Sequence, residues 1–306
     1  MKKFIVKLLL FISLFCISDW VIGGVFKLYD FTKSGGTHKL HILMTKQSPD
    51  LLILGSSRAS HHYNPILIGD SLKLDTFNAG FDGMGTSVGY GILTGVARRK
   101  FPEYILCEIS PNFDLYDESG SVPGIDNFNP YIFIPQIKDL MTDFDPNEKW
   151  KMLSNAYRLN SSLVKILPSI FTASDDYMAG FMPLSGKLKI DTYDKKIKNG
   201  NSPMKKINPV KEKYLRKLIE SAQSNGTKIV FTISPIYGGG DINSFKDELQ
   251  ILAEYDVPVL NHLNDSLLIG NMNYFQDKTH MNRDGADVYS KIIAKELLDY
   301  VNMPVQ

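Results

Sequence analysis

Short, predominantly apolar runs alternate with amphipathic segments along most of the chain. The runs are four to six residues long, as is typical of strands buried on both faces of a parallel sheet. Strands are predicted at residues 51–54, 75–78, 104–109, 228–233 and 257–260, the last at a sheet edge because it contains a proline. Helices are predicted at residues 88–99, 210–224, 244–255 and 284–300. This alternation predicts an α/β fold, a three-layer α/β/α sandwich with a mainly parallel central sheet.

The amino-terminal segment is hydrophobic in a different way. Lys2, Lys3 and Lys7 precede an apolar run from Leu8 to Ser18, and a less regular apolar stretch continues to Phe26. Residues 1–26 are therefore predicted to be an uncleaved signal anchor that crosses the membrane once, with a cleaved signal peptide and a secreted or periplasmic protein as the alternative. Lysines at the start of such a segment predict an extracytoplasmic domain after it.

The rest of the chain divides into two regions that differ in their pattern of polar and hydrophobic residues. Residues 27–49 are mixed and polar, which predicts a stalk, and residues 50–306 carry the α/β pattern. Within them, residues 117–209 are rich in proline, asparagine, aspartate and aromatic residues, with helical pieces near 147–167. This length is too great for a plain connection, so an inserted helical subdomain or lid is predicted. A substrate-shaping role and a purely structural role are both open.

Composition narrows the functional class only slightly. The chain has 306 residues, of which 43% are hydrophobic, and a formal net charge of +1, so a folded core is expected and nucleic acid is not. Cys16 and Cys107 lie in the export segment and in a predicted buried strand, which argues against a disulfide. No cysteine or histidine cluster has zinc spacing, and no cofactor is implied. The adjacent His61 and His62 are interpreted as a surface loop or helix start.

Three residue types capable of acyl-transfer chemistry lie at predicted strand and helix ends. Gly55-Ser56-Ser57 closes the strand at residues 51–54, and Asp277 stands three residues before His280, ahead of the last helix. Open α/β sheets place their ligand sites at the carboxyl ends of the strands. Serine, histidine and aspartate can supply a nucleophile, a base and a group that orients the base.

Four short blocks resemble those of the SGNH (GDSL-like) hydrolase superfamily. Gly55-Ser56-Ser57 matches Gly-Asp-Ser with the aspartate replaced, and residues 78–83 match Asn-x-x-x-x-Gly. Residues 110–113 match Gly-x-Asn-Asp only by Asn112, and residues 277–281 match Asp-x-x-His-Pro with methionine for proline. The blocks lie within residues 51–112 and 272–298. The resemblance implies a flavodoxin-like SGNH fold in a divergent, membrane-anchored branch.

The resemblance also assigns roles to these residues. It implies Ser57 as the nucleophile, with Ser56 as the fallback, His280 as the base and Asp277 as the residue that orients it. The oxyanion would meet the Ser57 N–H, the amide of Asn112 and one glycine N–H. That glycine is Gly83, with Gly80 as the rival, whereas Asn78 and Asn112 can each also be read as simple turn residues.

The function that the resemblance implies is an extracytoplasmic serine esterase or O-acyltransferase acting on acyl, in particular acetyl, esters of envelope carbohydrate. A non-catalytic envelope protein that binds glycan or scaffolds a polysaccharide-modifying complex is the alternative from another class. A lipid esterase is the third hypothesis, because aromatic residues of the insertion could form an acyl-chain pocket. These residues are Tyr131, Phe133, Phe171, Tyr177 and Phe181, and the alternative is that they form the insertion's own small core.

Overall fold

The structure is a computed structural model, and it describes residues 1–26, 30, 35–116, 124–171, 178–189 and 206–302. The chain divides into two compact units. Residues Met1–Ile42 and Gly124–Asp176 form the first, which we call the anchor unit. Residues Leu43–Pro123 and Tyr177–Gln306 form the second, the sheet unit.

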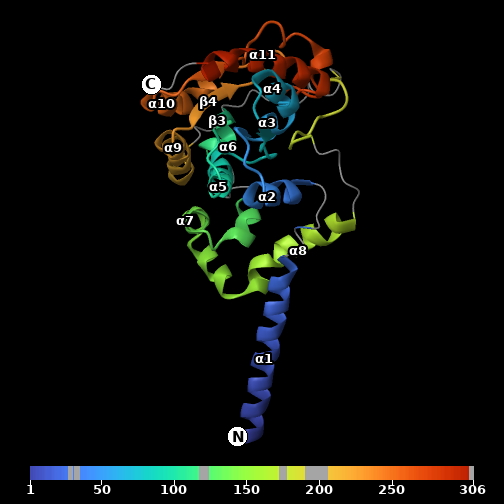
Figure 1. The fold of residues 1–306 in the computed structure, drawn as a ribbon, viewed down its shortest axis with the longest axis vertical. Coiled ribbons are helices and arrows are strands. Elements are labelled where there is room, and N and C mark those ends of the chain that lie inside the picture. Colours follow the sequence, from blue (N-terminus) through green and yellow to red (C-terminus); the bar gives the residue numbers. More distant parts are fainter. Residues whose placement is uncertain (27–29, 31–34, 117–123, 172–177, 190–205, 303–306) are drawn as a thin grey trace. The chain divides into compact units, whose positions relative to one another are not determined.

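The sheet unit is built on a five-stranded sheet in the order β2-β1-β3-β4-β5, and all four neighbouring pairs are parallel. The strands are β1 Leu51–Leu54, β2 Thr76–Asn78, β3 Tyr104–Glu108, β4 Lys228–Ile233 and β5 Val259–Asn261 (Figure 1). The parallel α/β sandwich that the hydrophobic pattern predicts is confirmed. β5 is an edge strand, and it begins just after the proline that the pattern placed inside it.

Helices cover both faces of this sheet, because each strand has apolar side chains on both sides. Leu51 and Ile53 of β1 belong to a buried cluster with Tyr289 and Ile293 of the last helix. On the other face, Gly89 approaches Leu54. The helices of the sheet unit are α3 Ser57–His62, α4 Pro65–Leu72, α5 Thr86–Ala97, α6 Pro111–Asp114, α9 Pro209–Ser224, α10 Lys246–Glu254 and α11 Arg283–Asn302, with 3₁₀ turns η5 Ile242–Phe245 and η6 Met272–Tyr274.

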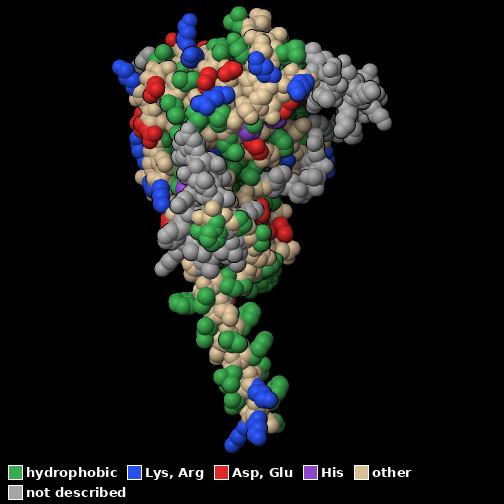
Figure 2. All heavy atoms as spheres, turned by 90° about the vertical axis from the view of Figure 1, so that its right-hand side faces the viewer, with side chains coloured by type: hydrophobic (Ala, Val, Ile, Leu, Met, Phe, Trp, Pro, Cys, Tyr) green, Lys and Arg blue, Asp and Glu red, His purple; other side chains and the backbone are tan. Residues whose placement is uncertain are grey.

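The anchor unit is helical. Its elements are α1 Lys2–Val25, η2 Ile125–Tyr131, α7 Pro135–Phe144, η3 Pro146–Leu153 and α8 Asn155–Phe171. Residues Lys2–Gly24 of α1 are long and apolar enough to cross a membrane by length and composition, and hydrophobic side chains surround the helix (Figure 2). Helical structure between residues 117 and 209 is thus observed at 125–171, while the roles of stalk and lid remain predictions.

One helix within the predicted stalk has a buried face. α2 spans Gly35–Thr45, across the division between the two units. Leu40, Ile42, Leu43 and Met44 are all at most 6% exposed. Residues 35–45 of the predicted stalk therefore form a packed helix.

Candidate active site

A sharp turn after β1 presents Ser57. Gly55 adopts φ +136°, and a Cβ at this position would lie 2.8 Å from the carbonyl oxygen of Glu108. Only glycine combines this backbone conformation with so close an approach to the neighbouring strand. The chain then enters α3, whose first residue is Ser57, and the Ser57 side chain is partly exposed.

Ser57, His280 and Asp277 form a continuous chain of hydrogen bonds. The Ser57 Oγ lies 2.8 Å from the His280 Nε2, and the His280 Nδ1 lies 2.9 Å from the Asp277 Oδ2. A carboxylate can only accept, so Nδ1 carries the proton and Nε2 is left to accept the serine proton. Ser57 and His280 are 223 positions apart in the sequence, yet their side chains meet. Nucleophile, base and orienting carboxylate thus follow one another as nucleophilic catalysis requires.

The Asp277 carboxylate is held by its own loop. Its Oδ1 accepts the backbone N–H groups of Thr279 and His280, each at 2.8 Å, and the Thr279 hydroxyl at 2.9 Å. Partial burial raises the pKa of Asp277, but the hydrogen bonds from the His280 ring and from the backbone outweigh it and lower the pKa well below its usual value. The group is therefore ionised throughout the neutral pH range and fixes the His280 tautomer.

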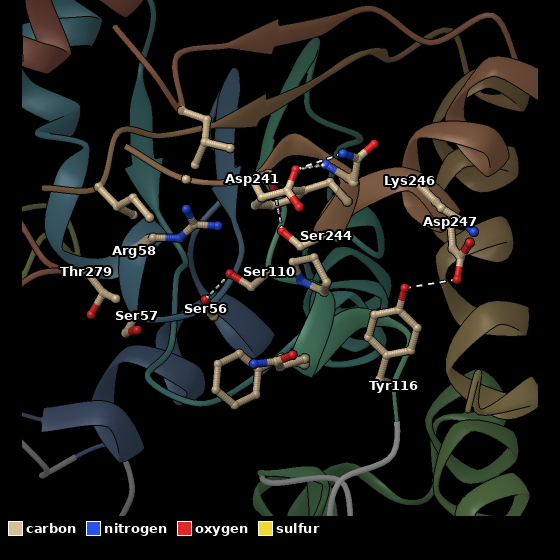
Figure 3. Close-up of a pocket in the computed structure, with 18 of the residues that line it drawn as sticks. Ser56, Ser57, Arg58, Ser110, Tyr116, Asp241, Ser244, Lys246, Asp247 and Thr279 are labelled. Carbon is tan, nitrogen blue, oxygen red and sulfur yellow. Dashed lines mark hydrogen bonds between the residues drawn. The ribbon is translucent and has the colours of Figure 1, made fainter. Parts of the chain in front are cut away.

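Ser56, the fallback nucleophile, has a different partner. Its hydroxyl lies 2.6 Å from the hydroxyl of Ser110, and the two residues are 1% and 7% exposed. Figure 3 shows this pair joined by a dashed line beside Ser57. The geometry favours Ser57 over Ser56, because the serine bonded to His280 is Ser57.

Two of the three predicted oxyanion donors lie around the same space. Ser57 begins α3, where backbone N–H groups have no acceptor within the helix. Asn112 lies in α6, directly after β3, and lines the same cavity as Ser57 and His280. Gly83 adopts φ +72° with open space around its Cα and is not among the residues that line the cavity. Its role as a donor stays a prediction.

The rival glycine and the asparagine of the second block are engaged in the fold. The Gly80 N–H donates to the Asn78 Oδ1 at 2.9 Å. The Asn78 amide donates to the carbonyl oxygens of Ala59 and Tyr63, both at 2.7 Å, and the residue is fully buried. Asn78 therefore ties the end of β2 to α3.

The interpretation of His61 and His62 as surface residues is wrong. They are 5% and 0% exposed, because α3 is covered on both sides by later parts of the chain. The His62 Nε2 accepts the backbone N–H of Met281 at 2.9 Å, so its Nδ1 carries a proton and donates to the Ser234 hydroxyl, also at 2.9 Å. Burial, followed by the charges of Arg58 and His280, lowers the pKa of His62 well below its usual value. A neutral His62 thus holds the residue that follows His280.

His62 belongs to a buried polar network that the sequence does not reveal. The Ser234 hydroxyl donates to the Glu108 Oε1 at 2.8 Å, and the Arg58 Nε lies 3.1 Å from the same oxygen. The Tyr63 hydroxyl donates to the other oxygen of Glu108. Glu108 is fully buried at the end of β3, and it forms an ion pair with Arg58, the residue that follows Ser57. The network supports both loops of the site.

A cavity of about 710 Å³ opens beside Ser57 and His280, and its lining belongs entirely to the sheet unit. This volume is typical of small-molecule sites. Its apolar side is formed by Pro111, Phe113, Tyr116, Ile236, Phe245 and Leu263. Figure 3 shows Ser57 and Thr279 at one end and, at the other, Tyr116, whose hydroxyl donates to the Asp247 carboxylate at 2.9 Å.

Of the five aromatic residues named in the insertion, the four that the structure describes do not line this cavity. Tyr131 and Phe181 are buried in their own units, and Phe133 and Phe171 are exposed on the anchor unit. Tyr177 lies outside the described residues. Among the residues that the structure describes, no group of three histidine, cysteine, aspartate or glutamate side chains could hold a metal ion.

Among known proteins, solved structures are similar to this chain. No protein-family model and no curated protein sequence matches the chain. A protein from Desulfitobacterium hafniense described as a lipolytic protein of the G-D-S-L family matches with a TM-score of 0.40 and 10% identity, over 80% of this chain and 97% of its own. The four sequence blocks resemble the same G-D-S-L group that the description of this structure names.

Two further structures are similar. One, from Streptococcus pneumonia and described as a platelet activating factor, has a TM-score of 0.42 and 14% identity, over 95% of this chain and 98% of its own. The other, an acylhydrolase by its description, from Bacteroides fragilis, has a TM-score of 0.43 and 11% identity, over 88% of this chain and 100% of its own. With TM-scores below 0.5, the fold assignment rests on the sheet itself and the site on its own hydrogen bonds.

Proposed function

We propose that this protein is a serine esterase or O-acyltransferase that works through an acyl-Ser57 intermediate. The observation that carries the proposal is the chain of hydrogen bonds from the Ser57 hydroxyl through His280 to Asp277. A serine hydroxyl alone is a poor nucleophile, and this arrangement supplies the base that it needs. The alternative of a non-catalytic envelope protein gives no reason for these three side chains to be aligned.

The proposed reaction has two halves. The Ser57 Oγ attacks the ester carbonyl carbon while the His280 Nε2 takes its proton, and the oxyanion accepts hydrogen bonds from the Ser57 N–H and the Asn112 amide. The carbon–oxygen bond to the alcohol then breaks, and His280 returns the proton to the leaving oxygen. In the second half, His280 takes a proton from water or a sugar hydroxyl as its oxygen attacks the acyl carbon of acyl-Ser57. The bond to the Ser57 Oγ then breaks and His280 returns the proton to Ser57, which gives hydrolysis or transfer.

The proposed substrate is an acyl ester, in particular an acetyl ester, of envelope carbohydrate. Two features of the cavity support a polar substrate with apolar faces. Phe113, Tyr116 and Phe245 offer aromatic surfaces, and Asp241, Asn243 and Lys246 offer hydrogen-bonding groups in the same lining. Sugars combine hydroxyl groups with an apolar ring face, so such a mixture suits them.

The proposed location is the cell membrane, with α1 as a single pass and the sheet unit outside the cytoplasm. The length and apolar composition of α1 support the pass, and the lysines at its start support the orientation. Envelope carbohydrate, and any complex that assembles it, would be met in that compartment.

A lipid esterase is the second candidate, and one observation favours it. Six apolar or aromatic residues line the cavity, so it could accept an acyl chain longer than acetyl. The rates on a series of p-nitrophenyl esters separate the two candidates. A preference for acetate favours the carbohydrate ester, and a preference for medium or long chains favours the lipid.

The deciding experiment measures two signals on the full-length protein in detergent. These are acetate release from p-nitrophenyl acetate and covalent labelling by a fluorophosphonate serine probe. Ser57→Ala and His280→Ala should lose both, whereas the matched control Ser71→Ala, an exposed serine of α4, should keep both. Labelling that persists in Ser57→Ala would refute Ser57 as the nucleophile. An unlabelled parent protein would favour the non-catalytic envelope protein.

A further inference from the structure

Helix α8 of the anchor unit turns an apolar face outward. We call three side chains the α8 stripe: Tyr157, Val164 and Phe171, which are 48%, 74% and 86% exposed. Their spacing of seven residues places them on one face of the helix. The exposed Pro168 extends the same face, and the exposed Asn160 is its polar member.

The buried side of α8 is mixed. Arg158, Leu159 and Ser162 are 7%, 1% and 4% exposed, and the Arg158 guanidinium lies 4.6 Å from the centre of the Phe133 ring. A helix that faces water exposes mainly polar residues. At the exposed positions of α8 that the structure describes, the side chains are mostly apolar, so the surroundings that suit this face are apolar as well.

A single carboxylate joins the start of α8 to α1. Asp19 stands inside the apolar helix α1 and accepts the Ser154 hydroxyl at 2.6 Å. It also accepts the backbone N–H groups of Asn155 and Ala156, at 2.9 and 2.8 Å. These are N–H groups that the helix itself cannot satisfy, and a negative charge at a helix N-terminus is favourable. An ionisable residue within a membrane segment needs such partners, and here they come from α8.

The place of Asp19 along α1 sets the depth of this joint. The candidate span ends at Gly24, five residues after Asp19. At a rise of about 1.5 Å per residue, the joint lies roughly 7–8 Å inside that end of the span. Interfacial amphipathic helices lie about 5–10 Å into the boundary between headgroups and acyl chains. The start of α8 is therefore held at the depth that such helices occupy.

An exposed tryptophan shortly precedes the residues of this joint in the sequence. Trp150 of η3 is 53% exposed, and the Lys149 ammonium lies 5.2 Å from the centre of its ring. Exposed tryptophan and tyrosine side chains are enriched at the level of the lipid headgroups, where the ring is in an apolar and the edge in a polar medium. Trp150 and Tyr157 flank the Asp19 contact on either side in the sequence.

We propose that the α8 stripe lies on the phospholipid bilayer that α1 enters. The anchor unit is then held by two elements, a helix that crosses the membrane and a helix that rests in its surface. Lipid is the occupant because the stripe is continuous, through Asp19, with the segment that crosses the bilayer. This surface is separate from the Ser57 cavity, so the inference rests on the proposed membrane pass of α1 and not on the proposed enzymatic activity.

The test uses full-length protein in phosphatidylcholine vesicles that contain a lipid with a spin label near the top of its acyl chain. Cys16 is replaced by alanine, and the buried Cys107 is left in place. An environment-sensitive fluorophore is attached in turn to Tyr157→Cys, Val164→Cys and Phe171→Cys. The control is Leu267→Cys in the sheet unit, at a side chain that is 77% exposed and equally apolar.

Two measurements decide the result. If the stripe lies on lipid, the spin-labelled lipid quenches the three α8 positions several-fold more strongly than position 267, and their emission shifts to the blue. Quenching no stronger than at position 267 overturns the proposal. A blue shift without lipid quenching also overturns it, because a second copy or another protein would then cover the stripe.

Discussion

Replacement of Asp277 by asparagine tests the role of this carboxylate with little disturbance of the loop. The Asp277 Oδ1 accepts the backbone N–H groups of Thr279 and His280, and the amide oxygen of an asparagine can keep both. The other oxygen, Oδ2, lies 2.9 Å from the His280 Nδ1. In the variant an NH₂ group takes this place, and an NH₂ group donates instead of accepting.

The expected consequence is a change of tautomer in His280. Its Nδ1 must then accept, so the ring proton moves to Nε2, which lies 2.8 Å from the Ser57 hydroxyl. A protonated Nε2 cannot take the serine proton. The same change in a serine protease triad lowers kcat by about 10⁴, and we expect a loss of this order, equivalent to roughly 5 kcal/mol in the activation free energy.

The assay is the rate of fluorophosphonate labelling together with kcat on p-nitrophenyl acetate, so that the result does not depend on one acyl donor. Asp70→Asn, a change of the same type at an exposed position of α4, is the matched control and should leave both unchanged. Circular dichroism and thermal unfolding check that the variant is folded. An Asp277→Asn protein within tenfold of wild type, alongside an inactive Ser57→Ala, would refute the reasoning.

Three further predictions follow from neighbouring groups. Asn112→Ala should lower kcat by about 10²–10³ if its amide meets the oxyanion, measured on the same ester. His62→Phe removes the acceptor of the Met281 N–H. It should lower kcat more than it changes KM, and the unfolding free energy should fall by about 1–3 kcal/mol. Burial raises the pKa of Asp114 from 3.8 to about 6, so the folded state holds this proton more tightly. The stability that this proton contributes is complete below about pH 4 and is lost as the pH rises through 6. Across this window, the unfolding free energy of wild type should fall by about 3 kcal/mol relative to that of Asp114→Asn, as measured by denaturant unfolding.

Each of the three has an outcome that contradicts it. An unchanged kcat in Asn112→Ala would remove this amide from the oxyanion site. A His62→Phe protein that loses stability but keeps kcat would make His62 structural and not a positioning residue. The third prediction compares the unfolding free energies of wild type and Asp114→Asn. If their difference does not vary from pH 4 to pH 7, Asp114 has an ordinary pKa in the folded protein.

The arrangement of the site could be predicted because it depends on the sheet. Parallel strands end at one edge, so residues that directly follow β1 and β3 must lie near each other. Ser57 and Asn112 have these positions, and the structure places both in the lining of one cavity. The runs that identify the strands are short and strongly apolar, which makes this part of the pattern easy to recognise.

The supporting contacts could not be predicted, because each joins segments far apart in sequence. His62 and Met281 are 219 positions apart, and no periodicity marks either residue. Adjacent histidines are usually solvent-exposed or only partly buried, so the sequence suggests a surface position. The position of the aromatic lining could not be predicted either: Phe245 of the sheet unit lines the cavity, and the exposed Phe171 does not. Helix α2 is only 11 residues long, and its apolar residues stand next to polar residues in the sequence. Its hydrophobic pattern is therefore difficult to recognise.

Three of the departures from the SGNH blocks have partners in the structure. Ser56 stands where the family has aspartate and Ser110 where it has glycine, and the two hydroxyls bond to each other at 2.6 Å. Met281 stands where the family has proline, which has no N–H, and the N–H that methionine adds is accepted by His62. A buried polar group without a partner costs about 1–3 kcal/mol, so unrelated replacements at these positions would be destabilising. Replacements that form hydrogen bonds within the structure keep the loops of Ser57 and His280 in place. This favours a catalytic site with altered residues over a non-catalytic protein with the same fold.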